Sequence, residues 1–407
     1  MLAGIVRFFK SIGPGFIIAS AVLGPGSVAI ASRVGSEHGY ALLWVVALST
    51  ICMATFASMA TRFAVAQKAS ILQAIADNYG RWFAMIIGIS SFLVAASFQF
   101  GNNLGIATAM EELTGVGSHV WPLIFTPIAM ILVFWGKRVY QILERLMITM
   151  VLIMIVAFVS NLLFVRPDWV GVFHGFVPSS YAALQFGDIA AIVATTFSLV
   201  GCLYQAYLVH DRGWKRSELN TGLRDTVMGI VVLGCISALI IITAAAALFP
   251  QGISVSTAGD MALQLEALFG PFSKHIFSIG LCAAAFSSLL VNAVIGGGLL
   301  SDGLGYGRSI QDKVPRFFSA LILLLGMLVA VFFKGDVVYA LVLASASSLF
   351  AIPAVAVGLL MVVNNEKVMG DLVNNRRQNS VGVLGMVLTI TLVAYMYYRL
   401  VTFIGQL

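Results

Sequence analysis

The middle of the first long apolar segment holds four residues, Gly24-Pro25-Gly26-Ser27, whose types and order open a helix. Proline removes an amide donor and clashes with the preceding helical turn, and glycine lets the chain leave helical geometry. Inside a membrane the freed carbonyls and amides need polar partners, because hydrocarbon offers none. The segment therefore predicts either a substrate cavity lined by Gly24 and Ser27 or a proline kink packed against a neighbouring helix.

A second group of candidate ligands lies in the apolar segment 187–209, where we expect an interruption between Val200 and Gln205. The Cys202 thiol could ionise on binding a soft metal, whereas a buried cysteine more often acts as a small hydrophobe. The side chains of Tyr204 and Gln205 can bond to a ligand or to its water shell. We count Leu199, at the start of this stretch, among the expected substrate-binding residues.

Amide side chains supply the remaining candidates. Gln99, Asn102 and Asn103 share one helix face by their i, i+3 and i+4 spacing, and Asn292 lies in a later apolar segment. Polar groups within a membrane usually face the bundle interior or a wet cavity, so the three form either a cavity wall or a set of interhelical hydrogen bonds. Amides do not carry protons as carboxylates do, and we therefore expect no strong proton coupling.

The elements that position these residues are membrane-spanning helices. The chain has 407 residues, of which 60% are hydrophobic and 10% charged, and its mean hydropathy is +1.00. A soluble domain has about 25% charged residues, so the composition predicts an all-α polytopic membrane protein. Basic residues occur in short loops without a basic tract, which argues against nucleic acid as a partner. No C-x-x-C spacing and no nucleophile–base pair occurs, so we expect no disulfide framework, no cofactor and no enzyme activity.

Eleven spans are predicted within a single domain, residues 1–407. Eighteen of the 23 lysines and arginines lie on one side if the N-terminus is cytoplasmic, and the positive-inside rule then places the C-terminus outside. We expect a monomer in the cell (inner) membrane, in contact with lipid. The predicted spans are 12–34, 40–61, 82–109, 120–136, 143–164, 187–209, 225–249, 273–299, 316–333, 337–362 and 382–404.

Ten of these spans could form two halves of opposite topology, about 12–164 and 187–362, followed by the extra helix 382–404. The first span of each half would then be the one that is interrupted. Paired broken helices of this kind point to an inverted-repeat transporter whose site lies where the repeats meet.

Three stretches resemble the Nramp divalent-metal transporters. Residues 23–62 resemble that family's first two helices, with a D-P-G-N turn followed by G-[YF]-x-L-L-W; residues 279–303 are similar to its A-A-G-Q-S-S segment; and residues 351–375 are similar to its K-x-M-G-x-x-x-N loop. The resemblance covers nearly the whole chain in order and spacing. It implies a LeuT-like fold, with a 5+5 inverted repeat plus an eleventh transmembrane helix, and transport of a divalent cation.

This chain departs from the family at the residues that carry its chemistry. Gly24 stands at the family's metal-binding Asp, Ser27 at its Asn, and Cys202 at its Met. Gln99 and Asn102 stand where the family has an Asp and a Glu linked to proton transfer. Neutral groups alone leave a bare divalent ion with a large desolvation cost.

Three explanations stay open at this point. The ion keeps most of its water, as suits Mg²⁺, in a cavity widened by Gly24, Ser27 and Cys202; or Ser27 and an ionised Cys202 bind a soft metal; or the substrate is not a divalent metal. We expect an alternating-access transporter of a Mg/Mn-like divalent cation. The alternatives are a transporter of a small organic solute or monovalent ion with the same fold, and a non-transporting membrane sensor or scaffold.

Overall fold

The computed structural model describes residues 13–135, 152–178, 186–309, 311–347 and 352–404, and every regular element in these ranges is helical. Each of the eleven predicted spans corresponds to one or two described helices. Outside the described residues lie residue 12 of the first span, residue 136 of the fourth, residues 143–151 of the fifth and residues 348–351 of the tenth. The helices within the spans are α2 (Pro14–Val22), α3 (Pro25–His38), α4 (Leu43–Ala66), α6 (Arg81–Thr114), α7 (Trp121–Trp135), Leu152–Val165, α10 (Phe186–Thr196), α11 (Leu199–Arg212), α12 (Leu219–Ala247), α15 (Ser273–Leu304), α16 (Lys313–Phe332), α17 (Val337–Ser347), α18 (Ile352–Val363) and α20 (Arg376–Ile404).

The first span is broken where the sequence predicts it. Helix α2 ends at Val22, α3 begins at Pro25, and the two are bent by 62°. Pro25 occupies the first turn of α3, where its missing amide costs no hydrogen bond. The interrupted geometry, rather than a continuous kinked helix, is thus present at the predicted position.

The second break lies earlier than predicted. The chain leaves helical geometry at Phe197 and Ser198, and residues 200–205 are a regular part of α11. The Ser198 hydroxyl caps α11 by accepting a hydrogen bond from the Gly201 amide, 3.3 Å away, a role for which serine is well suited. Gly201 lies inside the first turn of α11, where a Cβ atom would be 3.2 Å from the Ser198 hydroxyl and 3.4 Å from Ile18 of α2.

Helices α6 and α15 pack along each other over much of their length through small residues. A Cβ atom on Gly88 of α6 would lie 3.3 Å from the Cα of Gly303 in α15, and one on Gly303 would lie 2.7 Å from the carbonyl oxygen of Ala84. Small residues of this kind let helix backbones approach closely in membranes. The α6–α15 pair provides a rigid wall beside the two broken spans.

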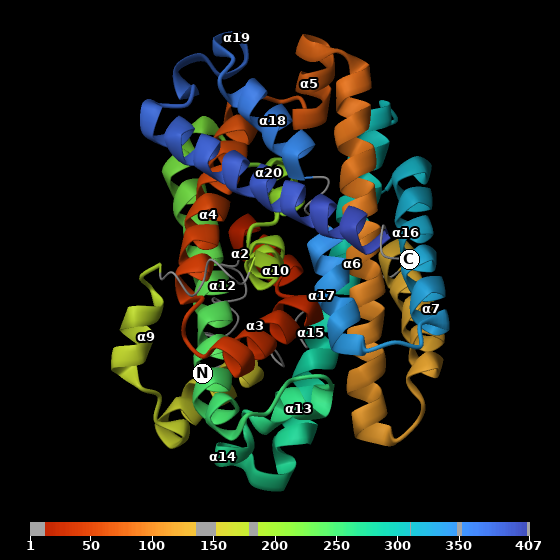
Figure 1. Ribbon diagram of the computed structural model, residues 1–407. Helices are drawn as coiled ribbons and strands as arrows, with labels where there is room; N and C mark the ends of the chain where they lie inside the picture. Colours follow the sequence, from red (N-terminus) through yellow and green to blue (C-terminus); the bar gives the residue numbers. More distant parts are fainter. Residues whose placement is uncertain (1–12, 136–151, 179–185, 310, 348–351, 405–407) are drawn as a thin grey trace, which may run out of the picture.

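Short helices cover the two ends of the bundle (Figure 1). Helices α5 (Ile71–Tyr79) and α19 (Glu366–Met369) lie at one end, here termed the α5 end, and α13 (Ala258–Leu263) and α14 (Glu266–Phe269) lie at the other, the α13 end. At the α5 end the buried Arg62 guanidinium donates to the carbonyl of Leu372, 3.0 Å away, and to the side chain of Asn374. Helix α9 (Trp169–Gly175) lies on the side of the bundle.

Candidate functional site

A cavity lies where the two broken spans meet α6 and α15. Its walls come from both sides of the α2–α3 break, the first turn of α11 and one face each of α6, α15 and α17. Among the described residues that line it, none carries a carboxylate, an imidazole or a thiol. The lining residues are Ala21, Val22, Gly24, Gly26, Ser27, Val94, Ala95, Phe98, Gly101, Asn102, Ser198, Val200, Gly201, Ser288, Asn292, Ile295 and Ala344.

Two carbonyls freed by the first break are satisfied by neutral side chains. The Ser27 hydroxyl donates to the carbonyl of Val22 at 2.8 Å. The carbonyl of Ala21 accepts from the Ser288 hydroxyl at 2.9 Å and from the Asn292 amide at 3.3 Å. Hydroxyl, amide and carbonyl oxygens therefore converge on one side of the cavity, and all of them can also bind a cation or its water.

Gly24 leaves the space that a larger side chain would occupy. A Cβ atom at this position would lie 3.0 Å from the Ser288 hydroxyl and 3.2 Å from the Asn102 side-chain oxygen. Any larger residue would point between these two groups and displace them by a few tenths of an ångström. The glycine thus keeps the polar walls formed by α6 and α15 accessible from the break.

The three amide side chains of α6, Gln99, Asn102 and Asn103, divide between the two predicted roles. Gln99 donates to the carbonyl of Leu289 in α15 at 2.6 Å, and Asn103 accepts from Thr126 of α7 at 2.8 Å, so both make interhelical bonds and are fully buried. Asn102 donates to the Gln99 side-chain oxygen at 3.0 Å and lines the cavity. Only Asn102 of the three is placed to contact a substrate.

The expected ligands from 199–205 lie away from the cavity, because the break precedes them. Leu199 is buried in the first turn of α11, and Gln205 donates to the Thr226 hydroxyl of α12 at 2.9 Å. Tyr204 stacks on Tyr207, with ring centroids 5.4 Å apart. The first turn of α11 contributes Ser198, Val200 and Gly201 to the lining instead.

Cys202 also lies away from the cavity. Its fully buried Sγ is 3.0 Å from the Sδ of Met53 and 3.6 Å from the Met53 carbonyl in α4. A thiol in this apolar contact packs as a small hydrophobe. The structure therefore does not place Cys202 beside Ser27 as a second metal ligand, contrary to expectation.

We expect Cys202→Ala to leave binding of Zn²⁺ and Mn²⁺ unchanged while lowering stability by about 1 kcal/mol through lost packing. Titration calorimetry and thermal melting of the purified protein measure the two effects separately. Loss of Mn²⁺ or Zn²⁺ binding with unchanged melting would show that the thiol is a ligand after all.

Side-chain contacts join the half-helices to their neighbours on both sides of the cavity. At the α5 end, Tyr207 of α11 donates to Asp302 at the end of α15 at 2.5 Å, and Arg308 bonds to His210 at 2.5 Å. At the α13 end, His38 of α3 bonds to Asp188 of α10 at 2.9 Å. The cavity thus lies between two sets of polar contacts, each of which must rearrange if that end is to open.

Two lining residues that sequence reasoning missed are Ser198 and Ser288. A serine directly before an apolar helical run is an N-cap signal, and it could have located the second break. Ser288 carried no such signal, since its bond to Ala21 depends on how α15 is rotated against α2.

The site combines neutral oxygen donors with helix ends. The C-terminal ends of α2 and α10 carry partial negative charge that favours a cation, and the N-terminal ends of α3 and α11 carry partial positive charge that favours an anion. With its carbonyl, hydroxyl and amide oxygens, the arrangement can hold a cation that retains water, or a small solute with groups of both signs.

A family profile and the sequences of known proteins both match this chain over most of its length. The family profile described as "Natural resistance-associated macrophage protein-like" matches residues 15–399. The divalent metal cation transporter MntH of Deinococcus radiodurans is 27% identical over 98% of this chain and 91% of its own length. MntH of Bacillus subtilis is 25% identical, over 92% of this chain and 89% of its own length.

Solved structures share the fold. The manganese transporter of Eremococcus coleocola, in complex with an aromatic bis-isothiourea compound, matches with a TM-score of 0.75 and 19% identity, over 95% of this chain and 86% of that one. MhsT in complex with L-phenylalanine matches with a TM-score of 0.64 and 16% identity, over 93% of this chain and 97% of that one. These likenesses establish a LeuT-like transporter fold.

Proposed function

Because this chain belongs to the Nramp family of membrane transporters, we propose that it moves a partly hydrated divalent cation of the Mg/Mn type through the cavity between its two broken spans. The curated relatives are named as divalent metal cation transporters. The observation that supports a hydrated ion is the lining itself, which offers neutral oxygens and no described carboxylate. Mg²⁺ gives up its water reluctantly and is the divalent ion best suited to such a site.

The residues proposed to contact the ion or its water are Ser27, Asn102, Ser288 and Asn292, together with the backbone at Ala21. Gly24 contributes space rather than a ligand. Neutral dipoles bind a naked divalent ion poorly, whereas water molecules of its first shell can donate to carbonyl and hydroxyl oxygens. The site therefore favours an ion that binds with most of its first-shell water still in place, because that ion avoids the free-energy cost of dehydration.

Movement of the ion follows from the two sets of contacts around the cavity. In an alternating-access cycle, the Tyr207–Asp302 contact at the α5 end and the His38–Asp188 contact at the α13 end would release in turn. The excess of basic residues at the α5 end supports a cytoplasmic location for that end, with the N-terminus inside and the C-terminus outside. The division into repeats 12–164 and 187–362, the cell (inner) membrane as location and the monomeric state belong to the same proposal.

Uptake into liposomes that contain the purified protein tests this function. We expect uptake of Mg²⁺ or Mn²⁺ down its own gradient, with little change when a proton gradient is imposed. Asn102→Leu should reduce this uptake at least tenfold, because an apolar side chain replaces a polar group of the cavity wall; a tenfold change corresponds to about 1.4 kcal/mol. Asn364→Leu, on an exposed amide outside the cavity, is the matched control. Proton-driven uptake, or full activity of the Asn102 variant, would contradict the proposal.

A small organic solute is the second candidate, and one observation favours it. Val94, Phe98 and Val200 add apolar surface to the cavity. The N-terminal end of α3, near Ser27, carries partial positive charge that can bind an anionic group. The structurally similar MhsT was solved with L-phenylalanine. Uptake of an amino acid by liposomes that take up no divalent cation would decide for this candidate.

A further inference from the structure

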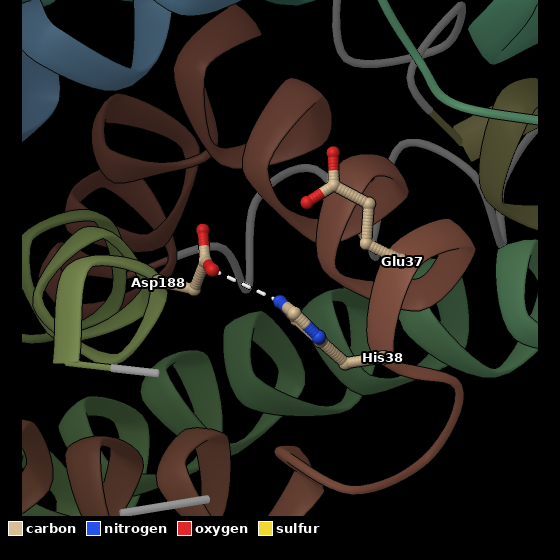
Figure 2. A group of neighbouring side chains, drawn as sticks. All are labelled: Glu37, His38 and Asp188. Carbon is tan, nitrogen blue, oxygen red and sulfur yellow. Dashed lines mark hydrogen bonds and ion pairs between the residues drawn. The ribbon is translucent and has the colours of Figure 1, made fainter. Parts of the chain in front are cut away.

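Three side chains at the α13 end lie close enough to bind one cation, outside the cavity described above. Glu37 and His38 end α3, and Asp188 lies in the first turn of α10. Each offers one ligand atom, and the three atoms lie within 4.8 Å of one another. Figure 2 shows the three side chains at the corners of a triangle, with His38 bonded to Asp188 and Glu37 on the helix turn that also carries His38.

The local charge favours a cation. The side chains of His38 and Asp188 are 8% and 19% exposed, so water screens them only partly. Arg33 bonds to Oε1 of Glu37 at 3.0 Å, which orients that carboxylate while its second oxygen can serve an ion. The two carboxylates and the one guanidinium together carry a net negative charge, and the C-terminal end of α3 adds partial negative charge.

We propose that Glu37, His38 and Asp188 form a second metal site, which takes a first-row transition-metal ion such as Zn²⁺ or Mn²⁺ and joins α3 to α10. Imidazole with carboxylate suits these ions, whereas Mg²⁺ prefers oxygen ligands and water. Metal–ligand bonds are ~2.1 Å long, so binding would draw the three atoms together by side-chain rotation. Three protein ligands leave at least one position for water, as in exchangeable sites.

The location gives such an ion a consequence for transport, and this consequence rests on the proposed function. Helices α3 and α10 are halves of the two broken spans, and their contact at the α13 end must open in the cycle. An ion that binds only when the two are together stabilises the closed arrangement by its differential affinity. Zn²⁺ at this end would then slow uptake of the cavity ion.

Titration calorimetry of the full-length protein in detergent tests the site, with Zn²⁺ and Mg²⁺ as probes. Changes to groups that only orient a ligand weaken metal sites by about 10–100-fold, so we expect His38→Gln to weaken Zn²⁺ binding by at least about 100-fold and Asp188→Asn to weaken it as well. His38→Cys should retain Zn²⁺, since a thiolate is also a ligand. His275→Ala, at an exposed histidine in α15, is the control and should bind as the wild type does.

A second measurement separates a lost site from a lost fold. Zn²⁺ should raise the melting temperature of the wild type and of His38→Cys but not of His38→Gln, while the three proteins melt as cooperative units without metal. Zn²⁺ isotherms that are the same for wild type and His38→Gln would overturn the site.

Liposome uptake tests the consequence for transport. For each protein, Mg²⁺ uptake is measured with Zn²⁺ added on the side of the α13 end and without Zn²⁺, and the two rates are divided. We expect Zn²⁺ to reduce wild-type uptake severalfold and to leave the His38→Gln ratio near one. Equal inhibition of both proteins would overturn the gating role. Zn²⁺ binding that depends on His38 in a protein that takes up no Mg²⁺ would uphold the site and reject the proposed function alone.

Discussion

Gly24→Asp is expected to tighten Mn²⁺ binding by at least about tenfold and to change Mg²⁺ binding less. The Cβ atom of the new side chain would lie 3.0 Å from the Ser288 hydroxyl and 3.2 Å from the Asn102 side-chain oxygen, so the carboxylate would project between these two groups. Two unit charges ~4 Å apart attract by about 4 kcal/mol at an effective dielectric constant of 20, and desolvation of the carboxylate offsets part of this. The side chain also fills space that a hydrated ion needs, so the ion that gives up water more easily gains more.

Calorimetric titration with Mg²⁺, Mn²⁺, Ca²⁺ and Zn²⁺ measures this effect. Gly24→Ala is the matched control, because it adds the same Cβ without a charge; we expect it to weaken Mg²⁺ binding modestly by crowding Ser288. Wild-type binding of Mg²⁺ or Mn²⁺ would support a neutral cavity for a hydrated ion. If the wild type binds no divalent cation while the Asp variant binds Mn²⁺, the native cargo is another solute.

Gly105→Ala is expected to destabilise the protein by about 1–3 kcal/mol and to reduce uptake at least tenfold. Gly105 of α6 lies directly against the helix break: a Cβ atom there would be 2.3 Å from Cβ and 2.6 Å from Cγ of Pro25. The rigid proline ring cannot rotate away, so the break itself must move. This displacement would shift Gly24 and Ser27 relative to the polar wall that α6 and α15 provide.

Gly101→Ala, one turn away on the same helix, is the matched control for stability. Its added Cβ would meet Leu341 at 3.5 Å and Ala344 at 3.7 Å, which are ordinary contacts. Because alanine is the better helix former by about 1 kcal/mol, this variant should melt at or slightly above the wild-type temperature. Equal melting of the Gly105 and Gly101 variants in detergent would show that the Pro25 contact does not constrain the break.

Hydropathy determined most of the architecture from sequence alone. Each predicted span has a described helical counterpart, since a run of about 20 apolar residues has no other stable arrangement in a bilayer. The first break was predictable because proline between glycines acts on its own backbone, whatever surrounds it. The neutral character of the cavity followed in part from Gly24 and Ser27, which the structure places in its wall.

Tertiary structure alone decided which way the side chains of the second broken span point. Cys202 and Gln205 face α4 and α12 instead of the cavity, because α11 packs that side against Met53 and Thr226 of those helices. A helix that is buried among other helices on most of its sides gives little periodic signal for its rotation, so the groups that it presents to a cavity depend on its neighbours.

The same limit applies to contacts between segments far apart in the chain. Ser288 reaches the carbonyl of Ala21 across 267 positions of sequence, and Asp188 reaches His38 across 150. The sequence determined which chemical groups the protein has and that they lie in helices; the packing of α3 against α10 and of α2 against α15 decided which of them meet. Helix formation depends on neighbours within a few residues, whereas a binding site depends on the relative rotation and depth of whole helices.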